Sequence, residues 1–266
     1  MANGLFDLSG RVALVSGAAS GMGRAMSLAL AEHGADLMLA DLDAEGLART
    51  AEDITRLGRR AVCVTCDVSD PEAIEALFAR LDHDFGRIDF LGNVAGGEPV
   101  IEPPETLAIE RLNASLQSLV IGRFAMCQQA GRRMLKAGSG SIVNIGSIAA
   151  VTALGRSHTA YSMAMGAVVQ MTRELSTEWS GRGVRVNAIL PAQIVNPGLR
   201  ARMAMDPGLE GTWLDGIPAG RLGRPDDIKG LAVLLASDAA SWITGALIPM
   251  DGGNLAINAG GTIRRR

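Results

Sequence analysis

Short, continuous apolar runs alternate with longer amphipathic stretches along nearly the whole chain. The runs that predict buried strands are Val12–Ser16, Asp36–Ala40, Ala61–Cys66, Ile88–Asn93, Ser141–Ile145, Val184–Leu190 and Ala246–Met250. The stretches that predict helices are Gly23–His33, Glu45–Leu57, Pro71–Asp84, Ala108–Lys136, Ser157–Arg182 and Asp226–Ala236. Strands that are apolar on both faces and alternate with helices are typical of parallel sheets. We therefore predict an α/β fold with a doubly wound parallel sheet of seven strands and helices on both faces.

Residues at the predicted helix ends support this pattern. Asp70 before Pro71 has the form of an N-cap followed by a first-turn proline, and Gly34 and Gly58 stand where helices end. No Pro/Ser-rich linker divides the chain, so we expect one domain over residues 1–266. The irregular stretch 192–224 predicts a substrate lid. The tail that ends in Arg264–Arg266 is interpreted as a subunit contact or a frayed end.

Composition narrows the class of protein. Hydrophobic residues make up 48% of the chain, which is enough to cover a sheet on both faces. The net charge of −3 argues against binding to nucleic acid. No apolar run reaches the length of a membrane span, and the chain does not begin with a signal-like segment, so we expect no membrane partner and a cytoplasmic location.

Cysteine and histidine positions do not indicate a metal site. Cys63 and Cys66 have CxxC spacing, but strand residues three apart face opposite sides. We interpret both as small buried apolar residues. His33, His83 and His158 are scattered, and we expect His158, on a loop, to lie at the surface.

A glycine-rich turn joins the first predicted strand to the first helix. Glycines permit a tight turn and close approach of a pyrophosphate, whose charge the free N–H groups of a helix start can bind. The turn therefore predicts a dinucleotide site. The residues assigned to it are Gly17, Ser20, Gly21, Met22 and Gly23.

Asp41 ends the second predicted strand. A carboxylate there can accept hydrogen bonds from ribose hydroxyls and repels a 2′-phosphate, and the Gly17–Gly21 turn contains no lysine or arginine. We therefore predict NAD rather than NADP. The alternative is that Asp41 is only a cap or turn residue.

In this order the motifs resemble the short-chain dehydrogenase/reductase family of the classical type, from Gly10 to Gly253. The resemblance implies a Rossmann-like fold and three further segments that bind the cofactor. The first contacts the adenine, the second follows the fourth strand, and the third lies near the nicotinamide. Their residues are Asp67 and Val68, then Asn93, Ala95 and Gly96, then Pro191, Ile194 and Asn196. The second segment departs from the family pattern at Val94, and the third at Ala192 and Asn196.

The same resemblance implies a catalytic set. Asn113, Ser147 and Tyr161 match the family's asparagine, serine and tyrosine, and Tyr161, which also touches the cofactor, is the chain's only tyrosine. The family carries a lysine four residues after the tyrosine, where this chain has Met165. Lys136 and Lys229 are expected far from the site.

Met165 is expected beside Tyr161, facing the same cleft, because residues four apart share a helix face. A lysine there lowers the pKa of the phenol and holds the nicotinamide ribose, whereas a methionine only fills the volume. Restoring the lysine is therefore expected to speed alcohol oxidation near neutral pH. Arg156 and His158, just before Tyr161, are candidate sources of positive charge.

We predict an NAD-dependent oxidoreductase that interconverts a small or medium alcohol or polyol and its ketone, or reduces a carbonyl or imine, with Tyr161 as proton donor. Three alternatives stay open. One is an NAD-binding protein of low or no activity, one is an engineered substitution at Met165, and one is a non-redox use of Ser147 and Tyr161.

The predicted pocket wall carries few charges, which favours a neutral substrate. It comprises Gly97–Pro99, Ile148–Ala150, Gln193 and the lid around Met203, Met205 and Trp213, unless these three serve only lid packing. Small residues in the Tyr161 helix are compatible with close helix contact. They are Ala160, Ala164, Gly166 and Ala167. The family resemblance implies a tetramer or a dimer, and we predict a homotetramer.

Overall fold

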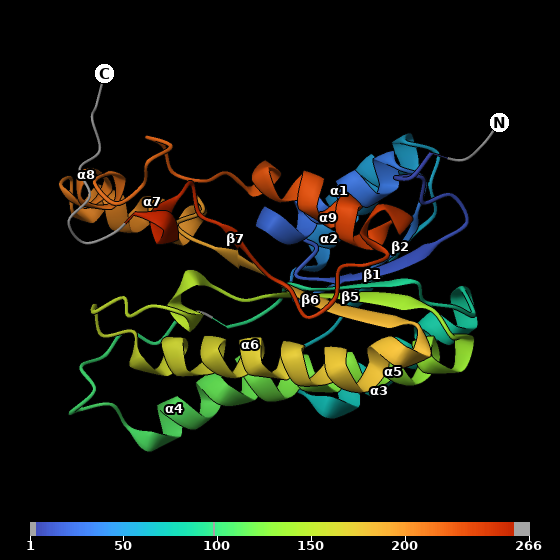
Figure 1. Ribbon diagram of the computed structural model, residues 1–266, viewed down its shortest axis with the longest axis horizontal. Helices are drawn as coiled ribbons and strands as arrows, with labels where there is room; N and C mark the ends of the chain where they lie inside the picture. The colour runs from blue at the N-terminus through green and yellow to red at the C-terminus, as the bar shows by residue number, and fades with distance from the viewer. Residues whose placement is uncertain (1–3, 98, 258–266) are drawn as a thin grey trace.

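The computed structural model describes residues 4–97 and 99–257, so Glu98 and the predicted arginine tail lie outside the described residues. Its centre is one parallel sheet in the order β3-β2-β1-β4-β5-β6-β7 (Figure 1). The strands are β1 (Val12–Ser16), β2 (Asp36–Asp41), β3 (Ala61–Thr65), β4 (Phe90–Asn93), β5 (Gly140–Ile145), β6 (Val184–Pro191) and β7 (Leu247–Met250). The order confirms the doubly wound prediction, with the strand order reversing between β1 and β4.

Helices cover both faces of the sheet (Figure 1). On one face lie α1 (Gly21–Glu32), α2 (Ala44–Arg56) and α9 (Lys229–Ala236). On the other lie α3 (Pro71–Asp84), α4 (Ile109–Leu116), α5 (Gly122–Ala137) and α6 (Thr159–Trp179). None of the helices in the described part of the chain is long and apolar enough to cross a membrane.

The two apolar layers follow from the alternation of side chains along each strand. In β1, Val15 packs in the layer that contains Met26 of α1, whereas Leu14 packs in the layer that contains Phe78 of α3. All four side chains are fully buried. The continuous apolar runs in the sequence therefore correspond to strands that are covered on both sides.

The long predicted helix 108–136 is interrupted. A π-helical turn at Gln117–Ile121 separates α4 from α5. Immediately after this turn, the backbone at Gly122 lies against the backbone at Val68. A Cβ added to Gly122 would lie 1.8 Å from the Val68 carbonyl oxygen. This close approach joins the helix to the loop after β3.

Two helices in the predicted lid were missed by the sequence pattern. They are α7 (Pro197–Met205) and α8 (Leu209–Leu214). Asn196 caps α7, since its Oδ1 accepts a hydrogen bond from the Leu199 N–H at 2.8 Å. The turn after α8 and the rest of the lid pack around Trp213, Ile217 and Leu222.

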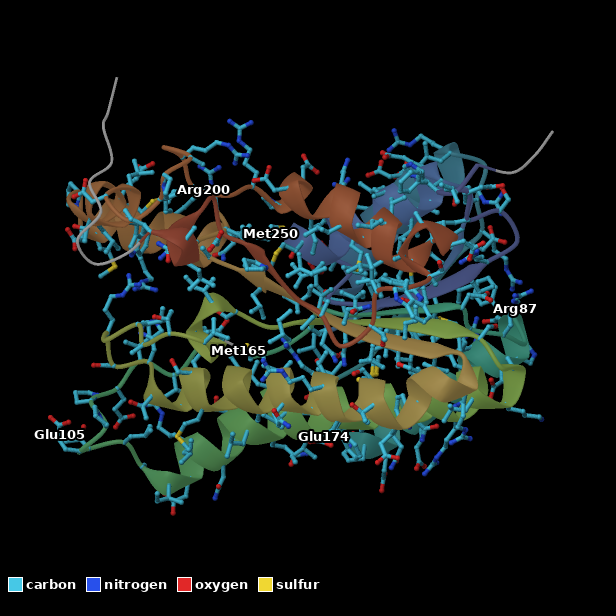
Figure 2. The ribbon with its side chains drawn as sticks, viewed as in Figure 1. Arg87, Glu105, Met165, Glu174, Arg200 and Met250 are labelled. Atoms are coloured by element: carbon cyan, nitrogen blue, oxygen red, sulfur yellow. The ribbon has the colours of Figure 1, made fainter. Side chains whose placement is uncertain are left out.

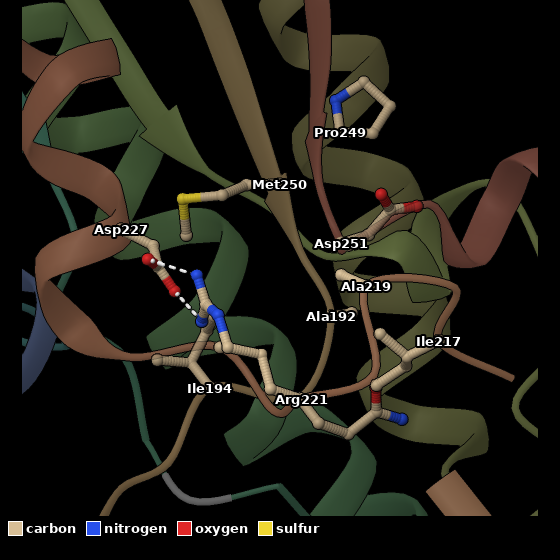
Figure 3. A pocket seen from close by; sticks show the side chains of 12 residues that line it. Ala192, Ile194, Ile217, Ala219, Arg221, Asp227, Pro249, Met250 and Asp251 are labelled. Carbon is tan, nitrogen blue, oxygen red and sulfur yellow. Dashed lines mark hydrogen bonds and ion pairs between the residues drawn. The ribbon is translucent and has the colours of Figure 1, made fainter. Parts of the chain in front are cut away.

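The lid is closed at its base by pairing between its two ends. The Gly223 N–H donates to the Gln193 carbonyl at 2.9 Å, and Arg221 forms a two-pronged ion pair with Asp227 at 2.7 and 2.9 Å (Figure 3). The two ends of the segment 192–224 therefore lie side by side.

One core prediction is wrong. Cys63 is exposed, while Cys66 is buried, and both are free thiols. The difference arises because β3 is the edge strand of the sheet, so a side chain there lacks a neighbour on one flank.

Candidate active site

The glycine-rich turn has the geometry that a bound phosphate requires. Gly17 and Gly21 have φ of +73° and +54°, in the left-handed region that favours glycine. A Cβ on Gly23 would lie 2.0 Å from the Gly17 carbonyl oxygen, so only glycine fits there. Ser20 begins α1 without a side-chain cap, which leaves the first N–H groups of the helix available.

The turn opens onto a cleft of about 580 Å³, here called the glycine cleft. Its described lining contains two carboxylates, Asp41 and Asp67, and no lysine, arginine or histidine. Of the predicted cofactor residues, all but Asn93, Pro191 and Tyr161 lie on it. The lining is Gly17, Ser20, Gly21, Met22, Gly23, Asp41, Leu42, Cys66, Asp67, Val68, Ser69, Val94, Ala95, Gly96, Gly97, Ser118, Ile194, Val195, Asn196 and Pro225.

Backbone contacts hold both carboxylates at the cleft. Asp41 Oδ2 accepts a hydrogen bond from the Ala19 N–H at 3.0 Å, which ties the end of β2 to the glycine-rich turn. Asp67 accepts from the N–H and hydroxyl of Ser69, and these bonds lower the pKa of the Asp67 carboxyl below its ordinary value. Asp41 is thus a turn residue and a cleft residue at once.

Asn93 lies below the cleft rather than on it. Its buried Nδ2 donates to the Arg123 carbonyl at 2.9 Å and to Asn144 Oδ1 at 3.2 Å, so it connects β4 to α5 and β5. Pro191, at the end of β6, is also buried and does not line the cleft. Both residues therefore support the cleft without forming its wall.

Ser147 and Tyr161 line a second cavity of about 170 Å³, here called the tyrosine pocket. Ser147 follows β5, and Tyr161 lies in the first turn of α6. Ile194 and Asn196 line both cavities, so the two meet there. The pocket lining is Pro99, Ser147, Ile148, Leu154, Arg156, His158, Tyr161, Ala192, Gln193, Ile194, Asn196, Leu199, Arg202 and Trp213.

Asn113 does not lie with Ser147 and Tyr161. It lies exposed on α4 and lines neither the glycine cleft nor the tyrosine pocket. Leu119 in the π-helical turn does pack in this region, where it is buried in one apolar cluster with Met165, and Tyr161 packs against that cluster. Asn113 therefore does not lie in either cavity with the other predicted site residues.

Met165 lies on α6 (Figure 2), but its side chain lines neither cavity, contrary to the expectation that it faces the cleft. Its side chain is 1% exposed and packs with Leu119, Ala164 and Val168, with Tyr161 at the edge of the cluster. A helix position four residues after Tyr161 is here part of the core because the π-helical turn brings an apolar side chain against it.

Arg123 of α5 is a buried cation that the sequence did not single out. Its Nε donates to the Ala95 carbonyl at 3.2 Å, its Nη2 to Val94 at 3.4 Å and its Nη1 to Ile145. Burial lowers the pKa of Arg123, and the charge of an ionised Tyr161 raises it. In the described residues Arg123 has no carboxylate partner. It therefore holds a positive charge under the ends of β4 and β5.

His158 is not at the surface, contrary to the expectation from its loop position. It is 9% exposed, lines the tyrosine pocket and contacts the Arg156 carbonyl through Nδ1. Burial lowers the pKa of His158, and the charges of Arg156 and Arg202 lower it further. His158 therefore contributes a neutral ring to the pocket at pH 7.

Only some of the remaining residues that were predicted to form the pocket wall line the tyrosine pocket. Ile148, Gln193 and Trp213 line the tyrosine pocket, while Met203 packs inside the lid and Met205 is exposed. Lys229 forms ion pairs with Glu32 and Asp226. Neither Lys229 nor Lys136 lines the glycine cleft or the tyrosine pocket. No cluster of metal-ligating side chains occurs among residues 4–97 and 99–257.

Comparison with known proteins decides the family. Residues 17–254 match the family model described as enoyl-(acyl carrier protein) reductase. The D-threitol dehydrogenase of Mycolicibacterium smegmatis is 43% identical over 251 residues, covering 93% of this chain and 94% of that protein. The chain belongs to the short-chain dehydrogenase/reductase family. Its classical type and its nature as an oxidoreductase enzyme follow from the same matches.

Two further members of the short-chain dehydrogenase/reductase family show the range of its chemistry. The 2-dehydro-3-deoxy-D-gluconate 5-dehydrogenase of Pseudoalteromonas atlantica is 38% identical, covering 93% of this chain and 97% of that protein. The structure of an NAD⁺-bound xylitol dehydrogenase has a TM-score of 0.87 and 29% identity, covering 92% of this chain and 99% of that one. The names of these three relatives thus describe dehydrogenases of polyols and of a sugar acid.

Restoring a lysine at position 165 is now expected to destabilise the fold. Met165→Lys would place an ammonium in an apolar cluster, and we expect the free energy of unfolding to fall by about 2–4 kcal/mol. Chemical denaturation measures this, with Met163→Lys, which is exposed on the same helix, as the control. A stable variant with faster alcohol oxidation would show that position 165 reaches the cleft after all.

Proposed function

We propose that this enzyme is an NAD-dependent dehydrogenase that interconverts a secondary alcohol of a small polyol-like substrate and its ketone. The observation that carries the proposal is the meeting of two cavities at Ile194 and Asn196. One cavity has the glycine-rich turn and Asp41, and the other has Ser147 and Tyr161. A dinucleotide extended along the first would bring its reactive end to the second.

The residues present fit a nicotinamide dinucleotide. The start of α1 at Gly21 would hold the pyrophosphate, Asp41 the adenosine ribose, Asp67 and Val68 the adenine, and Asn196 the carboxamide. When bound, the nicotinamide supplies the acceptor or donor of a hydride. The glycine cleft is open at these residues, and its close backbone approach at Gly17 leaves no room for a larger side chain.

Asp41 supports NAD over NADP. Members of this family are described with NAD⁺ and with NADP bound, so family membership does not decide between them. The carboxylate of Asp41 would repel a 2′-phosphate, and the described cleft lining has no cation to pair with it.

Replacing the Asp41 carboxylate should weaken the preference for NAD over NADP. Asp41→Asn keeps the shape but removes the charge, so we expect the ratio of NADPH to NADH dissociation constants to fall by about 10-fold or more. Fluorescence titration with each nucleotide measures it. Glu52→Gln, exposed on α2, is the control, and an unchanged ratio in Asp41→Asn would mean that Asp41 does not meet the ribose.

In the tyrosine pocket, two hydroxyls would handle the substrate oxygen. Ser147 would hydrogen-bond to it, and Tyr161 would donate a proton to it during ketone reduction. With Met165 in the core, the Arg123 guanidinium below the ends of β4 and β5 and the arginines that line the pocket would supply positive charge in its place. Reduction, in which the phenol gives up a proton, needs this charge less than oxidation does.

Two measurements test the proposed function and separate it from the alternative of an NAD-binding protein of low activity. Calorimetry with NADH tests binding in the glycine cleft, and a panel of polyols, hydroxy acids and their ketones tests turnover. Binding together with turnover supports the proposal. Tight binding with no turnover on any of them would favour the binding protein.

A homotetramer and a cytoplasmic location remain predictions. Apolar side chains are exposed on the outer helices at Ile109, Ile121, Phe124 and Met163, and Gly166 faces open space. Such a surface supports contact with another copy of the chain. Sedimentation analysis gives the assembled mass directly.

A further inference from the structure

The tyrosine pocket carries two arginines, of which only Arg156 was expected from the sequence as a candidate source of positive charge. Arg156, from the loop before α6, and Arg202, from α7, both line it, and its described lining contains no aspartate or glutamate. In the part of the chain that the structure describes, neither arginine forms an ion pair with a carboxylate. Both instead lie over the Trp213 ring, with guanidinium carbons 5.8 and 5.7 Å from its centroid.

These two charges lie close enough to oppose each other. Burial lowers the pKa of Arg156, and the neighbouring charge of Arg202 lowers it further. A guanidinium stays protonated at neutral pH, so both charges persist. Like charges held together without a counter-ion are unfavourable, and a bound anion would relieve the repulsion.

Trp213 adds a hydrogen-bond donor without a partner. The residue is 5% exposed and lines the pocket, and its Nε1–H makes no hydrogen bond in the described structure. A buried indole N–H normally has an acceptor. Arg156, Arg202 and Trp213 come from three separate segments, so three groups that can bind an anion meet at one place.

The same pocket holds the groups proposed to carry the chemistry. Ser147 and Tyr161 line it together with the two arginines, and its volume of about 170 Å³ is below the range of about 300–1,000 Å³ typical of ligand pockets. One small molecule must therefore reach both sets of groups. Its reacting carbon would lie at the hydroxyls and its anionic end at the arginines.

We propose that Arg156 and Arg202 bind a carboxylate of the substrate, so that the enzyme acts on a small hydroxy acid and its keto acid rather than on a neutral polyol. This inference rests on the proposed function and replaces the neutral substrate expected from the sequence. A phosphate ester offers similar anionic oxygens, but a carboxylate is smaller and matches the planar fork of a guanidinium.

Matched substrate pairs test the inference. The values of kcat/KM with NAD⁺ are compared for threonate and threitol, xylonate and xylitol, and gluconate and glucitol, with glucitol 6-phosphate as a third arm. We expect at least one acid to exceed its neutral partner by about 10-fold or more, since hydrogen bonds to charged groups have this strength.

Variants then assign the preference to the arginines. Arg202→Met and Arg156→Met are each expected to lower kcat/KM for the preferred acid by ~10–100-fold, with the neutral polyol changed by less than about threefold. Arg200→Met is the matched control, because Arg200 is exposed on the same helix, α7, and lines no part of the pocket (Figure 2).

A binding measurement avoids reliance on turnover. With NADH present, titration of the preferred acid should change the tryptophan fluorescence, and Trp213→Phe should remove most of that change even though Trp179 and Trp242 remain. Preference for neutral polyols, equal losses for acid and polyol in Arg202→Met, or preference for glucitol 6-phosphate over every acid would each overturn the carboxylate assignment. Failure to bind NADH or to turn over any alcohol would instead overturn the proposed function.

Discussion

Tyr161→Phe is expected to lower kcat by about 10³-fold in both directions, with the dissociation constant of NADH within about threefold of wild type. The phenol hydroxyl is the proton donor and acceptor in the proposed reaction, and general acid–base groups contribute about 10²–10⁴-fold. The chain has no second tyrosine to replace it. The phenylalanine ring preserves packing at the edge of the cluster of Leu119 and Met165, so the fold should be retained.

Steady-state kinetics on the preferred substrate and NADH fluorescence titration measure these two quantities. Met163→Leu, exposed on the same helix, serves as the control. The proposed role of Tyr161 is wrong if the phenylalanine variant keeps more than about a tenth of wild-type kcat. A fall in NADH affinity together with a lower melting temperature would instead indicate a damaged fold.

Arg123→Met is expected to lower the free energy of unfolding by about 2–4 kcal/mol. The arginine donates to the carbonyls of Val94, Ala95 and Ile145, and each buried carbonyl left without a donor costs about 1–3 kcal/mol. Release of a buried, unpaired charge offsets part of this loss. Denaturant unfolding gives the change by linear extrapolation.

A second variant separates the two roles of Arg123. Arg123→Lys keeps the positive charge but reaches fewer carbonyls, so we expect it to be destabilised and yet to keep more activity than Arg123→Met at a temperature where both are folded. Arg132→Met, exposed on the same helix, is the control. Equal activity in the two Arg123 variants would mean that the residue only supports the backbone.

The sheet could be predicted because its signals are local. Seven apolar runs and helix-end residues such as Asp70 and Pro71 mark strands and helices regardless of what surrounds them. The two lid helices were missed although the same cap signal stands at Asn196 and Pro197. Their sequence has mixed polarity because they pack only a small cluster around Trp213, so the periodic pattern is weak.

The glycine-rich turn and the end of β2 were predictable for a similar reason, and the family resemblance implied further residues of the glycine cleft, such as Asp67, Ala95 and Ile194. The tyrosine pocket was predictable in part, since Ile148, Gln193 and Trp213 were expected in its wall. Its pair of arginines was not, because Arg202 reaches the loop that carries Arg156 only when residues 192–224 fold over it, and no spacing in the sequence indicates that contact. Arg123 was hidden because an arginine in an amphipathic helix usually lies at the surface, whereas this one turns inward to three carbonyls.

Met165 shows the limit of helix periodicity. Spacing correctly placed it beside Tyr161, but whether that face meets solvent or core depends on the π-helical turn and Leu119 opposite. The place of Asn113 outside both cavities was also not predictable, since it depends on where the π-helical turn interrupts the helix.

The most direct test of the account is a crystal structure of the enzyme with NADH bound. We predict the pyrophosphate at the start of α1, the adenosine ribose at Asp41, and the nicotinamide between Asn196 and the hydroxyls of Ser147 and Tyr161. A nucleotide bound outside the glycine cleft, or a nicotinamide ring that the Tyr161 hydroxyl does not approach, would contradict it.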